Sequence, residues 1–98
     1  MPFVKQESRE FSNKNVEILN PNQSGIYGIF NTESWIYIGK AEDIRKRLLE
    51  HLNGDNPCIL KYSNLSWVGE VINDQKKRED REKELILELD PTCNRKIG

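Results

Sequence analysis

The segment "GIYGIFNTESWIYIG", residues 25–39, constrains the fold of this 98-residue chain more than any other stretch. Glycine, β-branched and aromatic residues alternate on both sides of the polar "NTES", a pattern typical of two β-strands joined by a turn. Side chains alternate faces along a strand, and two residues that pair directly across antiparallel strands lie on the same face. Tyr27 and Tyr37 therefore share a face only if the residue numbers of each pair add up to an even sum. A plain four-residue turn between Phe30 and Trp35 would give an odd sum. If both phenols serve one site, the hairpin therefore needs an odd-numbered loop or a β-bulge.

Two helices and a third strand are predicted after the hairpin. The segment "AEDIRKRLLEHL" opens with Asp43 at an N-cap position and repeats apolar residues every four positions, which predicts an amphipathic helix. The segment "LSWVGEVIN" favours a strand, and a charged helix is expected from about Asp74 to Leu89, before Pro91. The order strand, strand, helix, strand, helix predicts an α+β domain. Residues 1–24 are expected to form a polar, partly ordered leader before a single domain over residues 25–98.

Charge and apolar content exclude several classes of protein. Fifteen lysines and arginines against sixteen aspartates and glutamates leave a net charge of −1, so any basic surface must come from local clustering. No apolar run approaches the ~20 residues that a membrane span needs, and the first ten residues lack the features of a signal peptide. We expect a cytoplasmic protein that does not bind a membrane. In a reducing cytosol, Cys58 and Cys93 are predicted to be free thiols, and a zinc site with His51 lacks paired-ligand spacing.

The first helix carries a cation and an imidazole on one side. Arg47 and His51 are four residues apart and lie along the edge of its buried stripe. Such a pair either packs over the core or reaches a site at the rim of the sheet.

The last helix carries a carboxylate within its apolar stripe. Glu82 lies three and four residues before Leu85 and Ile86, so it faces the core or a cleft and needs a cation as partner. Arg78, one turn earlier, offers an ordinary ion pair. A divalent metal is the functional alternative, because Mg²⁺ often takes only one or two carboxylates alongside substrate phosphate.

Taken together, these motifs resemble the GIY-YIG nuclease superfamily. The resemblance rests on "GIY" and "YIG" ten residues apart, on "KAEDIRKRLLEH", and on Glu82 followed by "LI" and "PTCN", and it covers Gly25 to Asn94. Members include homing endonucleases, the nuclease domain of the bacterial excision-repair incision enzyme and some restriction enzymes, so repair and mobile elements are both possible settings. The resemblance implies a small three-stranded antiparallel sheet flanked by helices. It also implies a set of functional positions, which map onto Tyr27, Tyr37, Arg47, His51, Glu82 and Asn94.

The implied activity is that of an enzyme, a metal-dependent DNA endonuclease that hydrolyses phosphodiester bonds. Glu82 would hold Mg²⁺ or Mn²⁺ and Arg47 would hold the phosphate through its planar fork. Tyr27 would be the general base, with its pKa lowered by nearby positive charge, and His51 would pass protons onward or contact phosphate. Tyr37 would orient phosphate or water. Packing of the hairpin remains the alternative for both tyrosines, and a simple turn role remains the alternative for Asn94.

DNA contacts are expected from a few local cations. We predict that Lys40, Arg45 and Lys46 bind phosphate, with further contributions from residues 76–78, Arg95 and Lys96. Few contacts imply weak, salt-sensitive affinity, so targeting would need a homodimer or a separate partner. The alternatives are a catalytically idle GIY-YIG module that binds nucleic acid or protein, and an adaptor domain whose charged last helix binds another protein.

Overall fold

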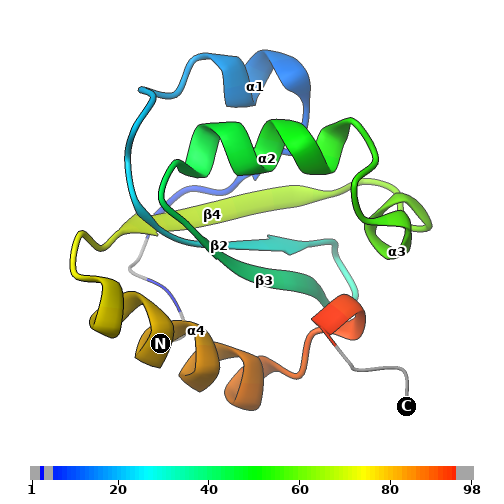
Figure 1. Cartoon of the computed structure of the whole chain (residues 1–98). Coiled ribbons are helices and arrows are strands. Elements are labelled where there is room, and N and C mark those ends of the chain that lie inside the picture. Colours follow the sequence, from blue (N-terminus) through cyan, green and yellow to red (C-terminus); the bar gives the residue numbers. More distant parts are fainter. Residues whose placement is uncertain (1–2, 4–5, 95–98) are drawn as a thin grey trace.

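The protein is a four-stranded antiparallel sheet with helices on both faces (Figure 1). The structure, a computed structural model, describes residue 3 and residues 6–94. The strand order is β1-β4-β2-β3, so β3 forms one edge. The strands are β1 (Arg9–Glu10), β2 (Gly25–Phe30), β3 (Trp35–Ala41) and β4 (Ser66–Val71). The helices are α1 (Asn13–Glu17), α2 (Ile44–Leu52), α3 (Pro57–Leu60), α4 (Gln75–Leu89) and the 3₁₀ turn η1 (Thr92–Asn94).

The β2–β3 hairpin contains a bulge, one of the two features that could place both tyrosines on one face. From Gly25 to Ile29 the paired numbers add to the even sum 66, and the register shifts between Ile29 and Phe30. Tyr27 therefore pairs with Gly39, two residues beyond Tyr37, and both phenols lie on the same face. Of the two alternatives, an odd-numbered loop or a bulge, the hairpin has the bulge.

Each face of the sheet has its own core. One core lies beneath α1, α2 and α3, and the other lies between the sheet and α4 (Figure 1). The first is the larger and consists of Val16, Tyr27, Ile29, Ile36, Ile44, Leu48, Ile59 and Trp67. The second consists of Phe3, Ile26, Ile38, Val68 and Leu85. These two layers fix α2 and α4 on opposite faces, with the edge strand β3 between them.

The N-terminal segment adds a strand and a helix to the predicted elements. The two-residue β1 pairs with β4 and makes the sheet four-stranded, one strand more than the resemblance implied. Ser12 caps the short α1, whose one buried residue, Val16, joins the core beneath α2. The sequence did not predict α1, because five mostly polar residues carry no clear helical period.

The predicted helix boundaries are confirmed by their caps. The Asp43 side chain accepts a hydrogen bond from the backbone N–H of Lys46 at the start of α2, and Asp74 accepts one from Lys77 at the start of α4. Asp90 is the C-cap of α4, and Pro91 comes next, where the sequence indicated that the helix stops. None of the helices in residue 3 and residues 6–94 is long and apolar enough to cross a membrane.

The two cysteines form a disulfide, so the expectation of free thiols is wrong. Cys58 in α3 and Cys93 in η1 lie with their Cα atoms 5.7 Å apart, within the range that a disulfide spans, and their sulfur atoms are bonded. They are 35 residues apart in the chain, and no sequence pattern indicated that α3 and η1 would meet. Because each sulfur is bonded to the other, neither is a thiolate that could hold zinc.

Candidate active site at the edge of β3

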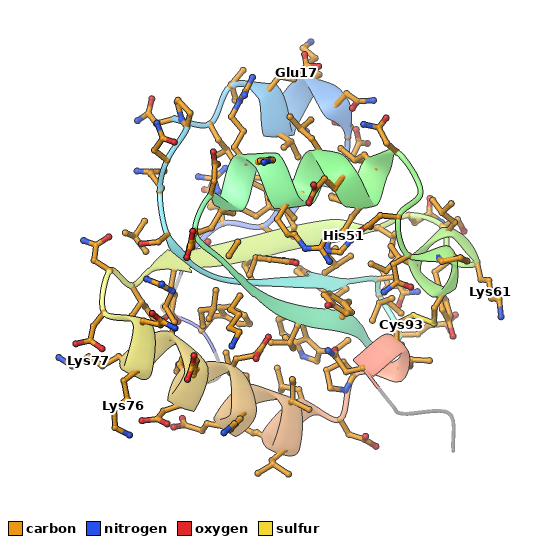
Figure 2. The ribbon with its side chains drawn as sticks, viewed as in Figure 1. Glu17, His51, Lys61, Lys76, Lys77 and Cys93 are labelled. Atoms are coloured by element: carbon orange, nitrogen blue, oxygen red, sulfur yellow. A yellow bond between two sulfur atoms is a disulfide. The ribbon has the colours of Figure 1, made fainter. Side chains whose placement is uncertain are left out.

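A tyrosine and a histidine from opposite sides of the core meet under α2. The hydroxyl oxygen of Tyr27 lies 2.7 Å from Nε2 of His51, and both side chains are fully buried. Figure 2 shows His51 directed from α2 towards the sheet. The sequence predicted His51 at the margin of the buried face, and the structure places it inside the core.

Space for the Tyr27 phenol exists because its paired residue on β3 is a glycine. Tyr27 pairs with Gly39 on β3 and with Gly69 on β4. A Cβ at position 39 would lie 2.3 Å from the Tyr27 hydroxyl oxygen, which is far inside van der Waals contact. The glycine of the "YIG" motif is therefore needed for the phenol to occupy this position.

Tyr37 completes an aromatic group around the imidazole. Its ring centroid lies 6.2 Å from that of Tyr27 and 5.1 Å from that of His51, which it meets edge-on. The Tyr37 side chain is partly exposed, so its phenol is accessible from outside while that of Tyr27 is not.

Asp55 links the imidazole to the guanidinium of Arg47. Its Oδ1 lies 2.7 Å from Nδ1 of His51, and its Oδ2 accepts a hydrogen bond from Nη1 of Arg47. Nη1 of Arg47 also donates to Glu50 at 3.0 Å. Sequence reasoning missed Asp55, because "NGDNP" was interpreted only as the end of a helix. Four-residue spacing places Arg47 and His51 on one side of α2, but Asp55 lies beyond Leu52, the last residue of the helix, so helical spacing did not indicate it.

Burial and neighbouring charge set the protonation states. Burial raises the pKa of the Tyr27 phenol well above its usual value, and Arg47 only partly opposes this. The cations of the chain alone therefore do not lower the Tyr27 pKa below its usual value. Burial also raises the pKa of Tyr37. It lowers the pKa of His51, although the hydrogen bond and negative charge of Asp55 act to raise it. At neutral pH, the site thus holds a neutral phenol beside a neutral imidazole.

Glu82 reaches the site from the other face, at the outer edge of β3. The backbone N–H of Lys40 donates a hydrogen bond to its carboxylate, and burial raises its pKa although Lys40 opposes the shift. Glu82 also contributes to the pKa values of Tyr27 and Tyr37, so the three groups share one electrostatic environment. Arg78, the alternative partner, instead donates to the backbone carbonyls of Ile72 and Asn73.

Asn94 also lies at this edge, bonded to β3 through its amide. Oδ1 accepts from the N–H of Ile38 at 2.7 Å, and Nδ2 donates to the Ile38 carbonyl at 2.8 Å. Asn94 therefore does more than form a turn. Its amide makes the hydrogen bonds that a neighbouring strand would make with the edge strand β3.

The predicted cations differ in their placement. Lys40 is exposed and lies 3.6 Å from Glu79, and Lys46 lines an open groove together with Arg47. Arg45 is directed towards α1 instead, where it donates to the carbonyl of Glu17. Lysines 76 and 77 are exposed on α4, whereas Arg95 and Lys96 lie outside the described residues.

Comparisons with known proteins agree with this arrangement. The sequence model of the GIY-YIG catalytic domain matches residues 23–96, and the chain belongs to that family. Over 47 residues it is 40% identical to the UvrABC system protein C of Helicobacter hepaticus; the match covers 47% of this chain and 8% of that protein.

Solved structures extend the similarity to most of the chain. The N-terminal GIY-YIG endonuclease domain of UvrC from Thermotoga maritima, bound to magnesium as its catalytic divalent cation, is 25% identical with a TM-score of 0.68. The match covers 85% of this chain and 96% of that domain. A point mutant of the same domain, also bound to its catalytic divalent cation, is 26% identical with a TM-score of 0.68, over 85% of this chain and 93% of that one. The chain is thus a homologue of a metal-binding endonuclease domain.

Proposed function

We propose that this chain is a divalent-metal-dependent DNA endonuclease that hydrolyses phosphodiester bonds. The observation that carries the proposal is the 2.7 Å contact between Tyr27 and His51, with Arg47 beside it and Glu82 at the same edge of the sheet. Membership of the GIY-YIG family and similarity to the UvrC endonuclease domain support it. The match spans only 8% of the UvrABC system protein C, so the substrate is part of the proposal.

Tyr27 acts as a proton relay in this proposal. A buried neutral phenol is a poor base alone, and in the free protein water does not reach it. When substrate binding brings a water to Tyr27, the phenol can take a proton from that water while giving its own to Nε2 of His51. The new hydroxide oxygen bonds to phosphorus, the bond from phosphorus to the 3′ oxygen breaks, and the leaving oxygen takes a proton from solvent. The imidazolium then returns its proton to the Tyr27 oxygen, and the phenol releases one proton to a water. This role is supported by the lowered His51 pKa, which keeps the acceptor unprotonated.

Arg47 binds the scissile phosphate. Both of its carboxylate contacts use Nη1, and its side chain is 36% exposed, so other guanidinium donors can face a phosphate in the groove that Lys46 also lines. Lys40 and Lys46 add sequence-independent contacts to the backbone. Tyr37 orients the phosphate or the water, and Asn94 holds the edge of β3 against which Glu82 lies.

Glu82 would hold the metal. The described residues contain no cluster of three or more histidine, cysteine, aspartate or glutamate side chains suited to a metal, so most ligands would come from water and substrate. A single half-buried carboxylate fits Mg²⁺, which often binds proteins in this way. When bound there, such an ion stabilises negative charge on the phosphate and on the leaving oxygen.

An idle module that binds nucleic acid or a protein partner is the second candidate. It is favoured by one observation, the engagement of Arg47 by both Glu50 and Asp55, which neutralises the cation in the free protein. Such a module would bind without cutting. Action as a homodimer or with a targeting partner in the cytoplasm remains a further proposal.

A cleavage assay separates the candidates. Plasmid, linear, branched and single-stranded DNA should be incubated with Mg²⁺, with Mn²⁺ and with EDTA. We expect metal-dependent cleavage of at least one substrate, abolished in a folded Arg47→Ala variant. DNA that is bound but left intact with every metal and substrate would favour the idle module.

A further inference from the structure

Asp55 is the one acidic side chain among the described residues that contacts both His51 and Arg47. The two contacts use different carboxylate oxygens, Oδ1 for the imidazole and Oδ2 for the guanidinium. The carboxylate therefore connects the residue that accepts a proton in the proposed reaction with the residue that binds phosphate.

The C-terminal cap of α2 places Asp55 at this point. The N–H of Gly54 donates to the carbonyl of His51, and the N–H of Asp55 donates to that of Glu50, the two bonds of a Schellman motif. Gly54 has φ +92°, the left-handed conformation that the motif requires and that favours glycine. The chain thus turns back at Gly54. Asp55, which lies just beyond the helix, therefore reaches back to His51 in the last turn of α2.

Once Asp55 is in place, the donors and acceptors around His51 determine which ring nitrogen carries the proton. An ionised carboxylate only accepts, so the proton of a neutral His51 lies on Nδ1 and Nε2 keeps its lone pair for the Tyr27 hydroxyl. The pKa of Asp55 is lowered: its hydrogen bonds from Arg47 and His51 outweigh the effect of burial. The groups facing His51 are Tyr27 on β2, Tyr37 on β3, Arg47 and Glu50 on α2, and Asp55 itself.

We propose that Asp55 is a positioning residue that holds His51 in the Nδ1–H tautomer and orients Arg47, so that proton acceptance and phosphate binding are aligned. This inference rests on the proposed function for its catalytic consequence. Its structural consequence, the tautomer, can be measured without any substrate.

The sharpest variant is Asp55→Asn. Arg47 has only donors, so the asparagine oxygen will face the guanidinium and its NH₂ group will face Nδ1 of His51. That arrangement moves the imidazole proton to Nε2, where it can no longer accept from Tyr27. Glu50→Gln is the matched control, because it alters the other partner of Arg47 and leaves the contact between Asp55 and His51 in place.

Nitrogen NMR of the imidazole tests the inference directly. His51 is the only histidine in the sequence, so one ring accounts for every histidine signal. We expect the Nδ1–H tautomer in the wild type and in Glu50→Gln, and the Nε2–H tautomer in Asp55→Asn. An Nε2–H tautomer in the wild type, or an unchanged tautomer in Asp55→Asn, would overturn the proposal.

Kinetics then test the catalytic consequence. Asp55→Asn should lower kcat by about 10²-fold or more, the usual contribution of general acid–base groups, with a smaller change in KM. Glu50→Gln should keep kcat within a few-fold. Equal kcat losses in the two variants would contradict the positioning role. If the wild type cuts no DNA, the proposed function fails, and the tautomer measurement still decides the role of Asp55.

Discussion

The amide of Asn94 pairs with both backbone groups of Ile38, as a neighbouring strand would. Asn94→Ala removes both hydrogen bonds and leaves partly buried groups on the edge of β3. At about 1 kcal/mol for each hydrogen bond, we expect the free energy of unfolding to fall by about 2 kcal/mol. Urea denaturation measures this directly, and an unchanged unfolding free energy would show that the pairing contributes nothing.

Gly39 controls where the Tyr27 phenol can lie. Gly39→Ala places a methyl group 2.3 Å from the present position of the hydroxyl oxygen, so the phenol must move and its contact with His51 must lengthen. We expect cleavage to fall by about 10²-fold, as for loss of a general base. Gly69→Ala is the control on the other neighbouring strand, because its Cβ would come no closer than 3.3 Å to Trp67. Equal effects of the two substitutions on cleavage would count against the steric role of Gly39.

The disulfide should stabilise the fold by closing a long loop. With a sequence separation of 35 between Cys58 and Cys93, the chain-entropy relation gives about 4 kcal/mol. Replacing both cysteines by serine should lower the free energy of unfolding by up to this amount. The wild type in a reducing buffer should behave in the same way, whereas the double variant should not respond to reductant. A wild type that is insensitive to reductant would contradict the assignment of the bond.

Stability should depend on pH through His51. Its pKa is lower in the folded protein than the usual 6.5, so the unfolded chain binds the proton first as the pH falls. The contribution of His51 is therefore fully present above pH 6.5 and decreases as the pH falls through the folded pKa. The unfolding free energy should decrease from pH 8 to pH 5.5 in the wild type and change less in His51→Gln. A parallel pH dependence in both proteins would refute the assignment.

Patterns along single elements predicted much of this structure, and contacts between distant elements account for what they missed. The parity argument for Tyr27 and Tyr37 required an odd-numbered loop or a bulge, and the hairpin contains the bulge. Asp43 caps its helix as expected, and the last helix begins next to Asp74 as expected. The Cys58–Cys93 bond and the Asn94–Ile38 pairing join residues 35 and 56 positions apart, and no local pattern encodes such contacts.

Protonation states were the least predictable part of the site. The sequence shows that Arg47 and Lys40 can approach Tyr27, which favours a lowered pKa. It does not show that the phenol is buried completely, and burial outweighs the cations. Asp55 lies beyond the predicted end of its helix, so its return to His51 depends on the turn at Gly54.

The most direct test of the account compares two neighbouring carboxylates on α4 in one plasmid cleavage assay. Glu82 lies against the backbone of Lys40, whereas Glu79, one turn earlier, contacts the exposed side chains of Lys40 and Gln75. We predict that the wild type and Glu79→Ala cut plasmid DNA with Mg²⁺, and that a folded Glu82→Ala variant does not. Cleavage by Glu82→Ala at the wild-type rate, or cleavage by the wild type in EDTA, would contradict metal-dependent hydrolysis at this site.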